Sequence, residues 1–102
     1  MNYEDILEVV LARANGAKEK YHEFDSVGHG ASKLREEYAE TVVELERYFN
    51  TPDSSSERGA LLERIYQEAV DVAVVSLRLA WLARSLNQPT PKLSEVILGG
   101  TE

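Results

Sequence analysis

The sequence predicts an all-α fold in which an antiparallel helical hairpin follows an N-terminal helix. Apolar residues recur every three or four positions in three segments, which is the spacing of amphipathic helices. Two stretches rich in glycine, serine, asparagine and proline separate these segments, as turns do. We expect helices at about residues 3–24, 31–49 and 57–86, and a C-terminal tail at 87–102. A chain of 102 residues is expected to form a single domain, 1–102.

The first helix is expected to begin after Asn2, because asparagine is a preferred N-cap residue. Glu4 and Asp5 then lie near the positive end of the helix dipole. Gly16 interrupts the segment, and since glycine inside a helix costs about 1 kcal/mol relative to alanine, a kink or an early end is expected there. The apolar face consists of Tyr3, Ile6, Leu7, Val10, Ala14, Ala17, Tyr21 and Phe24.

The second helix carries acidic residues beside its apolar face. Residues 26–30 hold two glycines around His29, which favours a turn before this helix begins. On a helical wheel, Glu37 and Glu40 fall on one flank of the apolar face together with Lys33 and Glu44. Glu36 lies further round. The apolar face itself consists of Leu34, Tyr38, Val42, Leu45 and Phe49.

The third helix follows a loop at residues 50–56, in which Pro52 would end any helix that reached it. Ser56 is the expected N-cap, and Pro89 stops the helix at its far end. Glu68 and Asp71 flank its main apolar face, so they bear the same relation to the core as the glutamates of the second helix. That face consists of Leu61, Leu62, Ile65, Ala69, Val72 and Leu79.

A second apolar face lies on the opposite side of the third helix and consists of Val70, Val74, Leu77 and Trp81. A helix that is apolar on two sides needs more neighbours than one thin domain supplies. We therefore expect a subunit interface and a homodimer or homotetramer with a four-helix-bundle-like core. In the tail, one short turn is expected at about Leu93 to Leu98.

The composition is acidic, with 18 Asp and Glu against 11 Lys and Arg, for a net charge of −7. No run of basic residues occurs, so binding to nucleic acid or to an anionic membrane surface is not expected. The absence of cysteine excludes disulfides and thiolate metal ligands. The acidic N-terminus does not resemble a signal peptide, and no apolar run approaches the roughly 20 residues that span a bilayer. The expected location is the cytoplasm.

Two pairs of carboxylates organise the hairpin. Glu37 and Glu40 are one helical turn apart, and so are Glu68 and Asp71. Two antiparallel helices would therefore point four carboxylates toward one another. Like charges repel at such distances unless a cation lies between them, and several oxygen ligands suit Mg²⁺ or Mn²⁺. The sequence thus predicts a divalent-metal site on the helix pair.

With these residues placed, the chain resembles the MazG-like, all-α nucleoside triphosphate pyrophosphohydrolases. The family signature is E-E-x-x-E followed, after a gap, by E-x-x-D; here it matches residues 36–40 and 68–71. The similarity extends over roughly residues 29 to 84. It implies Mg²⁺-dependent cleavage of a nucleoside triphosphate between the α- and β-phosphates. The products would be the monophosphate and pyrophosphate.

The resemblance also implies roles for individual residues. Glu37, Glu40, Glu68 and Asp71 would coordinate Mg²⁺, or Mn²⁺, and Glu36 would support them as the fifth member of the catalytic set. Lys33 and Arg78 are the nearest basic residues for a triphosphate, and His29 is a further candidate for a phosphate contact. Phe24, His29 and Trp81 are candidates for contact with a base, and the base itself is left open.

Each of these roles has a simpler alternative. The carboxylates could be two solvated helix faces, and Lys33 and Arg78 could form ordinary salt bridges to nearby glutamates. Glu36, Glu44 and Glu46 are expected to be solvated and not to bind the metal, and Glu19 and His22 are expected to form an exposed pair. Trp81 is expected in the interface. For the whole protein, the alternative is a non-catalytic acidic helical oligomer that acts as a nucleotide-binding or adaptor protein.

Overall fold

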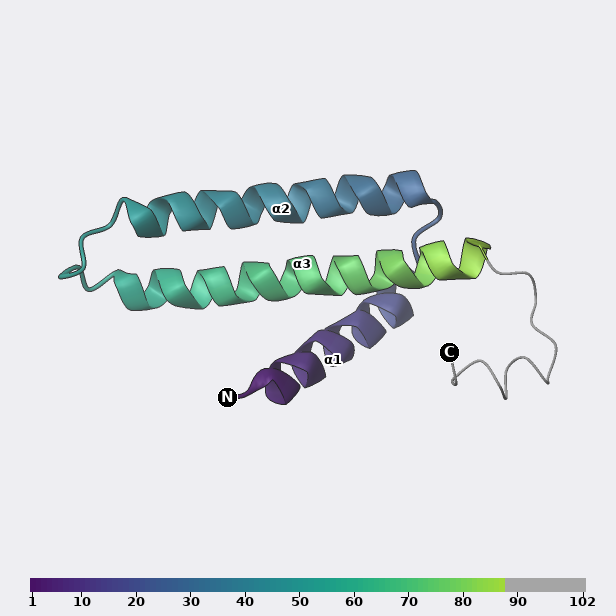
Figure 1. Cartoon of the computed structure of the whole chain (residues 1–102), viewed down its shortest axis with the longest axis horizontal. Coiled ribbons are helices and arrows are strands. Elements are labelled where there is room, and N and C mark those ends of the chain that lie inside the picture. Colours follow the sequence, from purple (N-terminus) through teal and green to yellow (C-terminus); the bar gives the residue numbers. More distant parts are fainter. Residues whose placement is uncertain (88–102) are drawn as a thin grey trace.

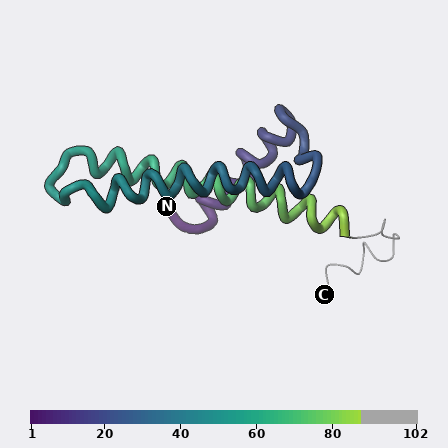
Figure 2. Tube along the Cα trace, turned by 90° about the horizontal axis from the view of Figure 1, so that it is seen from above, coloured from purple at the N-terminus to yellow at the C-terminus, as the bar shows by residue number. Residues whose placement is uncertain are grey.

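The fold is all-helical across residues 1–87, the part of the chain that the computed structural model describes. It consists of α1 (Tyr3–Tyr21), α2 (Val27–Phe49) and α3 (Arg58–Asn87). Helices α2 and α3 run antiparallel as a long hairpin, and α1 crosses α3 at an angle (Figure 1). The view from above agrees that α2 and α3 lie side by side along their length (Figure 2). The predicted fold class and hairpin are confirmed. The turn expected at Leu93 to Leu98 lies outside the described residues.

Helix α1 begins where the sequence predicts. The Asn2 side chain accepts a hydrogen bond from the Asp5 N–H at 2.9 Å, and the Asp5 carboxylate accepts one from the Asn2 N–H at 3.0 Å, which is a capping box. Gly16 does not interrupt the helix. The helix ends at Tyr21, earlier than residue 24, because His22 has a φ of 63°, which non-glycine residues rarely adopt.

Helix α2 begins at Val27, so the turn expected over residues 26–30 is wrong. The Ser26 side chain caps the helix by accepting a hydrogen bond from the His29 N–H at 3.0 Å. Gly30 lies inside the helix, at a point where neighbouring side chains leave no room for a Cβ. A Cβ at that position would lie 2.7 Å from Leu79 Cδ1 and 3.0 Å from Phe24 Cδ2. Close approach of neighbouring side chains, and not a turn, accounts for this glycine.

Helix α3 agrees with the prediction to within one residue at each end. The N-cap expected at Ser56 is not found, because α3 begins at Arg58 and Glu57 is the residue before it. The Ser55 hydroxyl accepts a hydrogen bond from the Glu57 N–H at 3.1 Å ahead of the helix. Arg58 lies over the Tyr48 ring and donates to the Thr51 carbonyl at 2.9 Å, which ties the first residue of α3 to the end of α2.

The apolar core consists of two clusters along α3. One joins α1 to α3 through Val10, Ala14, Val70 and Val74, and the other consists of Phe24, Val75 and Leu82. Val70 and Val74 were assigned by sequence to a subunit interface, and that assignment is wrong because α1 covers them. Leu77 and Trp81, from the same predicted face, remain 40% and 50% exposed.

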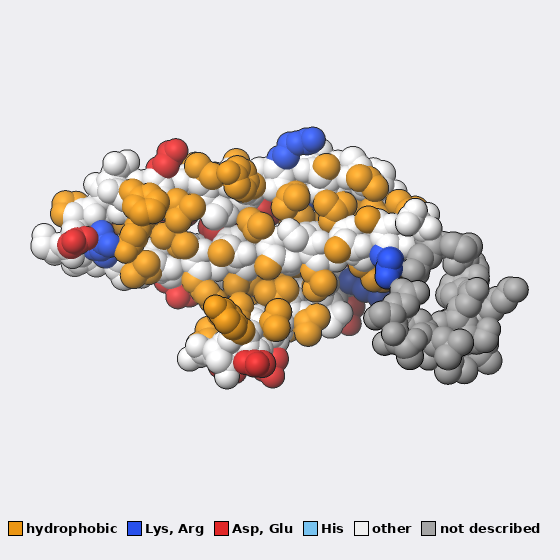
Figure 3. All heavy atoms as spheres, in the orientation of Figure 1, with side chains coloured by type: hydrophobic (Ala, Val, Ile, Leu, Met, Phe, Trp, Pro, Cys, Tyr) orange, Lys and Arg blue, Asp and Glu red, His pale blue; other side chains and the backbone are white. Residues whose placement is uncertain are grey.

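The apolar face predicted for α2 is also wrong in part. Tyr38 is 63% exposed and Phe49 is 77% exposed, while Glu37 is buried. Figure 3 shows apolar side chains spread over all three helices on one face of the molecule. Among residues 1–87, no helix is both long and apolar enough to cross a membrane.

Candidate metal centre

Three glutamates from the two hairpin helices converge. Glu37 and Glu40 of α2 and Glu68 of α3 each place a carboxylate oxygen so that all three oxygens lie within 4.8 Å of one another. Glu37 is buried, Glu68 is half-buried and Glu40 is exposed. The cluster is therefore closed on the inner side and open to solvent at Glu40. Such an arrangement could hold a metal ion that reaches it from the side of Glu40.

Two of these carboxylates are incompletely paired. Glu37 Oε1 lies 3.4 Å from Lys33 Nζ, but Glu37 Oε2 is buried and has no hydrogen-bond partner among residues 1–87. Glu68 Oε2 is in the same condition. A buried carboxylate oxygen without a partner is costly. Carboxylate oxygens are the ligands that Mg²⁺ and Mn²⁺ prefer, and the two unpaired oxygens belong to one cluster. The residues therefore fit a divalent cation of this kind.

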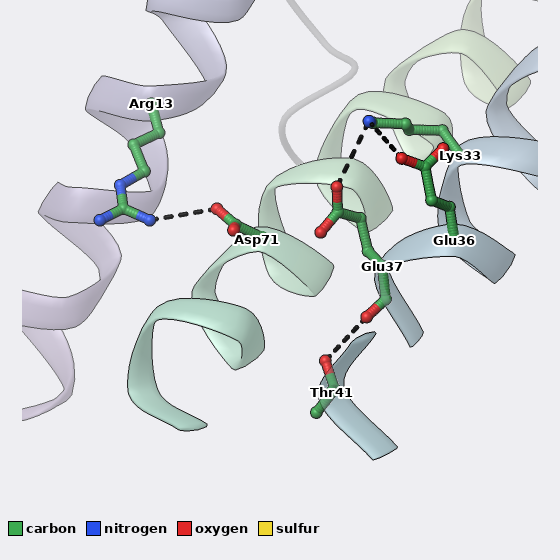
Figure 4. Close-up of polar contacts among 6 residues, drawn as sticks. All are labelled: Arg13, Lys33, Glu36, Glu37, Thr41 and Asp71. Atoms are coloured by element: carbon green, nitrogen blue, oxygen red, sulfur yellow. Dashed lines mark hydrogen bonds and ion pairs between the residues drawn. The ribbon is translucent and has the colours of Figure 1, made fainter. Parts of the chain in front are cut away.

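The electrostatics of the cluster favour either a proton or a cation. Burial raises the pKa of Glu37, and the neighbouring charge of Glu40 raises it further, while Lys33 opposes both effects. Burial is also the largest cause that raises the pKa of Glu68. The negative charges of Glu40, Asp71 and Glu37 raise it further. Glu37 and Lys33 are drawn in Figure 4. A divalent ion would offset both the burial of these charges and the repulsion between them.

We expect these carboxylates to lower the stability of the metal-free protein as pH rises. The folded-state pKa of Glu37 is raised above its unfolded value, so the folded protein binds more protons in the interval between them. The contribution of Glu37 to stability should therefore fall from about pH 4.3 upward, through its raised pKa. Thermal unfolding in EDTA measures this. The stability of Glu37→Gln relative to the wild type should increase with pH, and a constant difference from pH 4 to 7.5 would contradict the assignment.

Asp71, the fourth predicted ligand, does not join the three glutamates. Its Oδ1 lies 3.1 Å from Nη1 of Arg13, a residue of α1. Figure 4 shows Arg13 on one side of Asp71 and Glu37 on the other. The other terminal nitrogen of Arg13 donates to the Gln67 side chain. Sequence analysis missed Arg13, because it lies 58 residues from Asp71 and no local spacing connects the two.

Lys33 and Glu36 lie at the edge of the cluster. Lys33 Nζ is 3.4 Å from an oxygen of Glu36 and 3.4 Å from an oxygen of Glu37, which are the salt bridges to nearby glutamates that the simpler alternative predicts (Figure 4). The Glu36 carboxylate is exposed and is not one of the three converging groups. Lys33 therefore brings one positive charge to the cluster.

Arg78 of α3 and His29 of α2 both contact the linker between α1 and α2. Arg78 Nη2 donates to the His22 carbonyl at 2.6 Å, and its guanidinium lies 4.3 Å from the centre of the Phe24 ring. Its side chain is only 10% exposed. His29 packs edge-on against Phe24 and accepts a hydrogen bond from the Asp25 N–H at 3.2 Å. These contacts give Arg78 a clear structural role, since it holds the strained His22 carbonyl in place.

Glu44 differs from its prediction as a solvated residue. Its side chain is 12% exposed, Oε1 lies 2.9 Å from Arg47 Nη1, and Oε2 is buried without a hydrogen-bond partner among residues 1–87. Glu44 lies two helical turns beyond Glu37 and hence on the same side of α2. That spacing was the available signal. Glu46, by contrast, is exposed as expected.

Comparison with known proteins adds no identity to this geometry, because no protein-family model, curated protein or solved structure matches the chain. Over residues 1–87, the fold and the site define an all-helical protein with an acidic cluster that could hold a metal ion.

Proposed function

We propose that the protein hydrolyses a (deoxy)nucleoside triphosphate to the monophosphate and pyrophosphate in a Mg²⁺-dependent reaction. The observation that carries the proposal is the convergence of Glu37, Glu40 and Glu68 from two helices, with buried oxygens left unpaired at Glu37 and Glu68. The resemblance of residues 36–40 and 68–71 to the MazG-like signature supports the same reaction class. Such a function would place the protein in the cytoplasm.

Glu37, Glu40 and Glu68 would hold Mg²⁺ or Mn²⁺, and Asp71 is the candidate for a fourth ligand. A bound divalent ion would neutralise phosphate oxygens and lower the pKa of a water molecule. Lys33, at the edge of the cluster, would attract the negative charge of the triphosphate. Glu36 would hold Lys33 in place, since the two lie 3.4 Å apart. No covalent nucleophile is needed for this hydrolysis.

Arg78 and His29 have weaker support as substrate contacts. The guanidinium of Arg78 is engaged by the His22 carbonyl and the Phe24 ring, so it would have to leave both to reach a phosphate. The His29 side chain is half-exposed near the start of α2, so it could contact a phosphate. The proposed reaction does not depend on either residue.

We expect pyrophosphate release from at least one nucleoside triphosphate in the presence of Mg²⁺ or Mn²⁺, and none in EDTA. A panel of ribo- and deoxyribonucleoside triphosphates tests this and ranks the bases at the same time. Phosphorus NMR of the products separates release of pyrophosphate from release of orthophosphate. Orthophosphate as the first product, or no turnover of any member of the panel, would contradict the proposal.

We further propose that the protein is a homodimer or homotetramer with a four-helix-bundle-like core. Tyr38 of α2 is 63% exposed, and Leu62 and Trp81 of α3 are each 50% exposed, which is more apolar surface than these helices need for their own packing. Sedimentation velocity should give a mass of two or four chains. A monomer at about 100 µM protein would contradict the proposed assembly.

The second candidate function is a non-catalytic nucleotide-binding or adaptor protein. Two observations favour it: Asp71 is paired with Arg13, and Arg78 is engaged by the linker, so two predicted site residues already have partners. The same substrate panel separates the candidates. A nucleotide that binds without turnover would favour the non-catalytic nucleotide-binding protein.

A further inference from the structure

The contact between α1 and the metal centre bears on how the centre is assembled. We propose that Arg13 is a positioning residue that holds the Asp71 carboxylate away from Glu37, Glu40 and Glu68, so that Asp71 binds a divalent cation only after leaving Arg13. This inference rests on the proposed metal centre. It adds a residue, on a helix outside the sequence signature, that controls how many carboxylates the cation receives.

Arg13 is held firmly enough to act in this way. Its Nη1 lies 3.1 Å from Asp71 Oδ1, and its other terminal nitrogen donates to the Gln67 side chain. Gln67 in turn donates through Nε2 to Glu63 Oε1 at 2.8 Å. The guanidinium therefore binds two residues one turn apart on α3. A planar fork of donors suits this arrangement, whereas a single ammonium does not.

Asp71 nevertheless lies within reach of the cluster. It follows Glu68 by three residues on α3, so both side chains project from one side of the helix. Its negative charge is among the causes that raise the pKa of Glu37 and of Glu68. A change of side-chain rotamer is the movement that would take its carboxylate from Arg13 toward the three glutamates. The backbone of α3 can stay in place.

Arg13 is expected to compete only modestly with the cation for the Asp71 carboxylate. The side chains of Arg13 and Asp71 are 37% and 42% exposed, so solvent screens the pair. An ion pair with this exposure corresponds to at most about a fivefold factor in an equilibrium constant. A cation that gains a carboxylate ligand can overcome it, but the contact with Arg13 should weaken the observed affinity by that factor.

Titration calorimetry with Mn²⁺ alone, on the full chain, tests the inference. The variants are Arg13→Gln, Asp71→Asn and the double variant, with Lys18→Gln as a matched control. Lys18 is an exposed cation on the same helix. We expect Arg13→Gln to bind Mn²⁺ more tightly than the wild type, by up to about fivefold. Lys18→Gln should bind within about twofold of the wild type, because distant exposed charges are screened. In the Asp71→Asn background, the removal of Arg13 should give no gain.

Any of three comparisons of affinity would overturn the inference: an Arg13→Gln affinity equal to or below that of the wild type, an equal gain in the Asp71→Asn background, or an equal gain in Lys18→Gln. The last two would mean that only net charge matters. Absence of Mn²⁺ binding to Arg13→Gln would overturn it as well. No triphosphate is present in this experiment, so a failure of the proposed hydrolysis would leave the affinities unchanged and is recognised separately.

Discussion

Glu68→Gln is expected to lower pyrophosphate release by at least about 100-fold, because even residues that only support metal ligands cost 10- to 100-fold when replaced. Glutamine keeps the size of the side chain but loses the charge that would bind the cation. The fold should survive the change. Burial and the charges of Glu40, Asp71 and Glu37 all raise the pKa of Glu68, so removal of its charge relieves repulsion in the metal-free protein. Steady-state release with Mg²⁺ and circular dichroism measure the two effects.

Glu46→Gln is the matched control for Glu68→Gln. Glu46 is an exposed glutamate of the hairpin outside the carboxylate cluster, so its replacement removes the same charge without touching the candidate site. We expect Glu46→Gln to retain wild-type turnover and Glu40→Gln to lose it as Glu68→Gln does. Turnover by Glu68→Gln at the level of Glu46→Gln would contradict the assignment of the site.

Gly30→Ala is expected to destabilise the protein by about 1–3 kcal/mol, the usual cost of overpacking a filled core. The new Cβ would lie 2.7 Å from Leu79 Cδ1 and 3.0 Å from Phe24 Cδ2, so both side chains must shift. Phe24 is 6% exposed and is enclosed by Val75 and Leu82, which leaves little room for that shift. Chemical denaturation measures the change in the free energy of unfolding.

Gly16→Ala controls for the effect of helix propensity. Gly16 also lies inside a helix, but a Cβ there would have no atom within 4 Å. Alanine should therefore stabilise the protein at this position by up to about 1 kcal/mol. If Gly30→Ala and Gly16→Ala both stabilised the protein, the close packing of α2 against α3 and Phe24 would be disproved.

The helices could be predicted because their apolar spacing and caps are local signals. Asn2 and its capping box are an example, since all the contacts lie within one turn. The start of α2 was mistaken because glycine at position 30 has a tertiary cause, a contact with Leu79 that no local pattern contains. The exposure of Tyr38 has a related origin. Tyr38 follows Glu37 by one residue and so lies about 100° further round the helix, away from the side on which Glu37 meets Glu68 of α3.

The candidate site was predictable to the extent that it is built from one-turn spacings. Glu37, Glu40 and Glu68 come together as their positions on two antiparallel helices require. The position of Asp71 depends on Arg13, which belongs to a helix whose crossing angle the sequence does not encode in any spacing. The sequence left Arg78 open as a phosphate contact or as a salt-bridge partner of a glutamate. Its contact with the His22 carbonyl was missed because that carbonyl becomes available only when α1 ends early.

The most direct test of the central claim is the amount of free Mn²⁺, measured by electron paramagnetic resonance, when metal-free protein is titrated with Mn²⁺ at pH 7.5. The signal of hydrated Mn²⁺ should decrease in the presence of the wild type and of Glu46→Gln. It should persist with Glu68→Gln and Glu40→Gln, which lack one carboxylate of the cluster. An undiminished signal with the wild type, or an equal decrease with all four proteins, would show that Glu37, Glu40 and Glu68 do not form a metal centre.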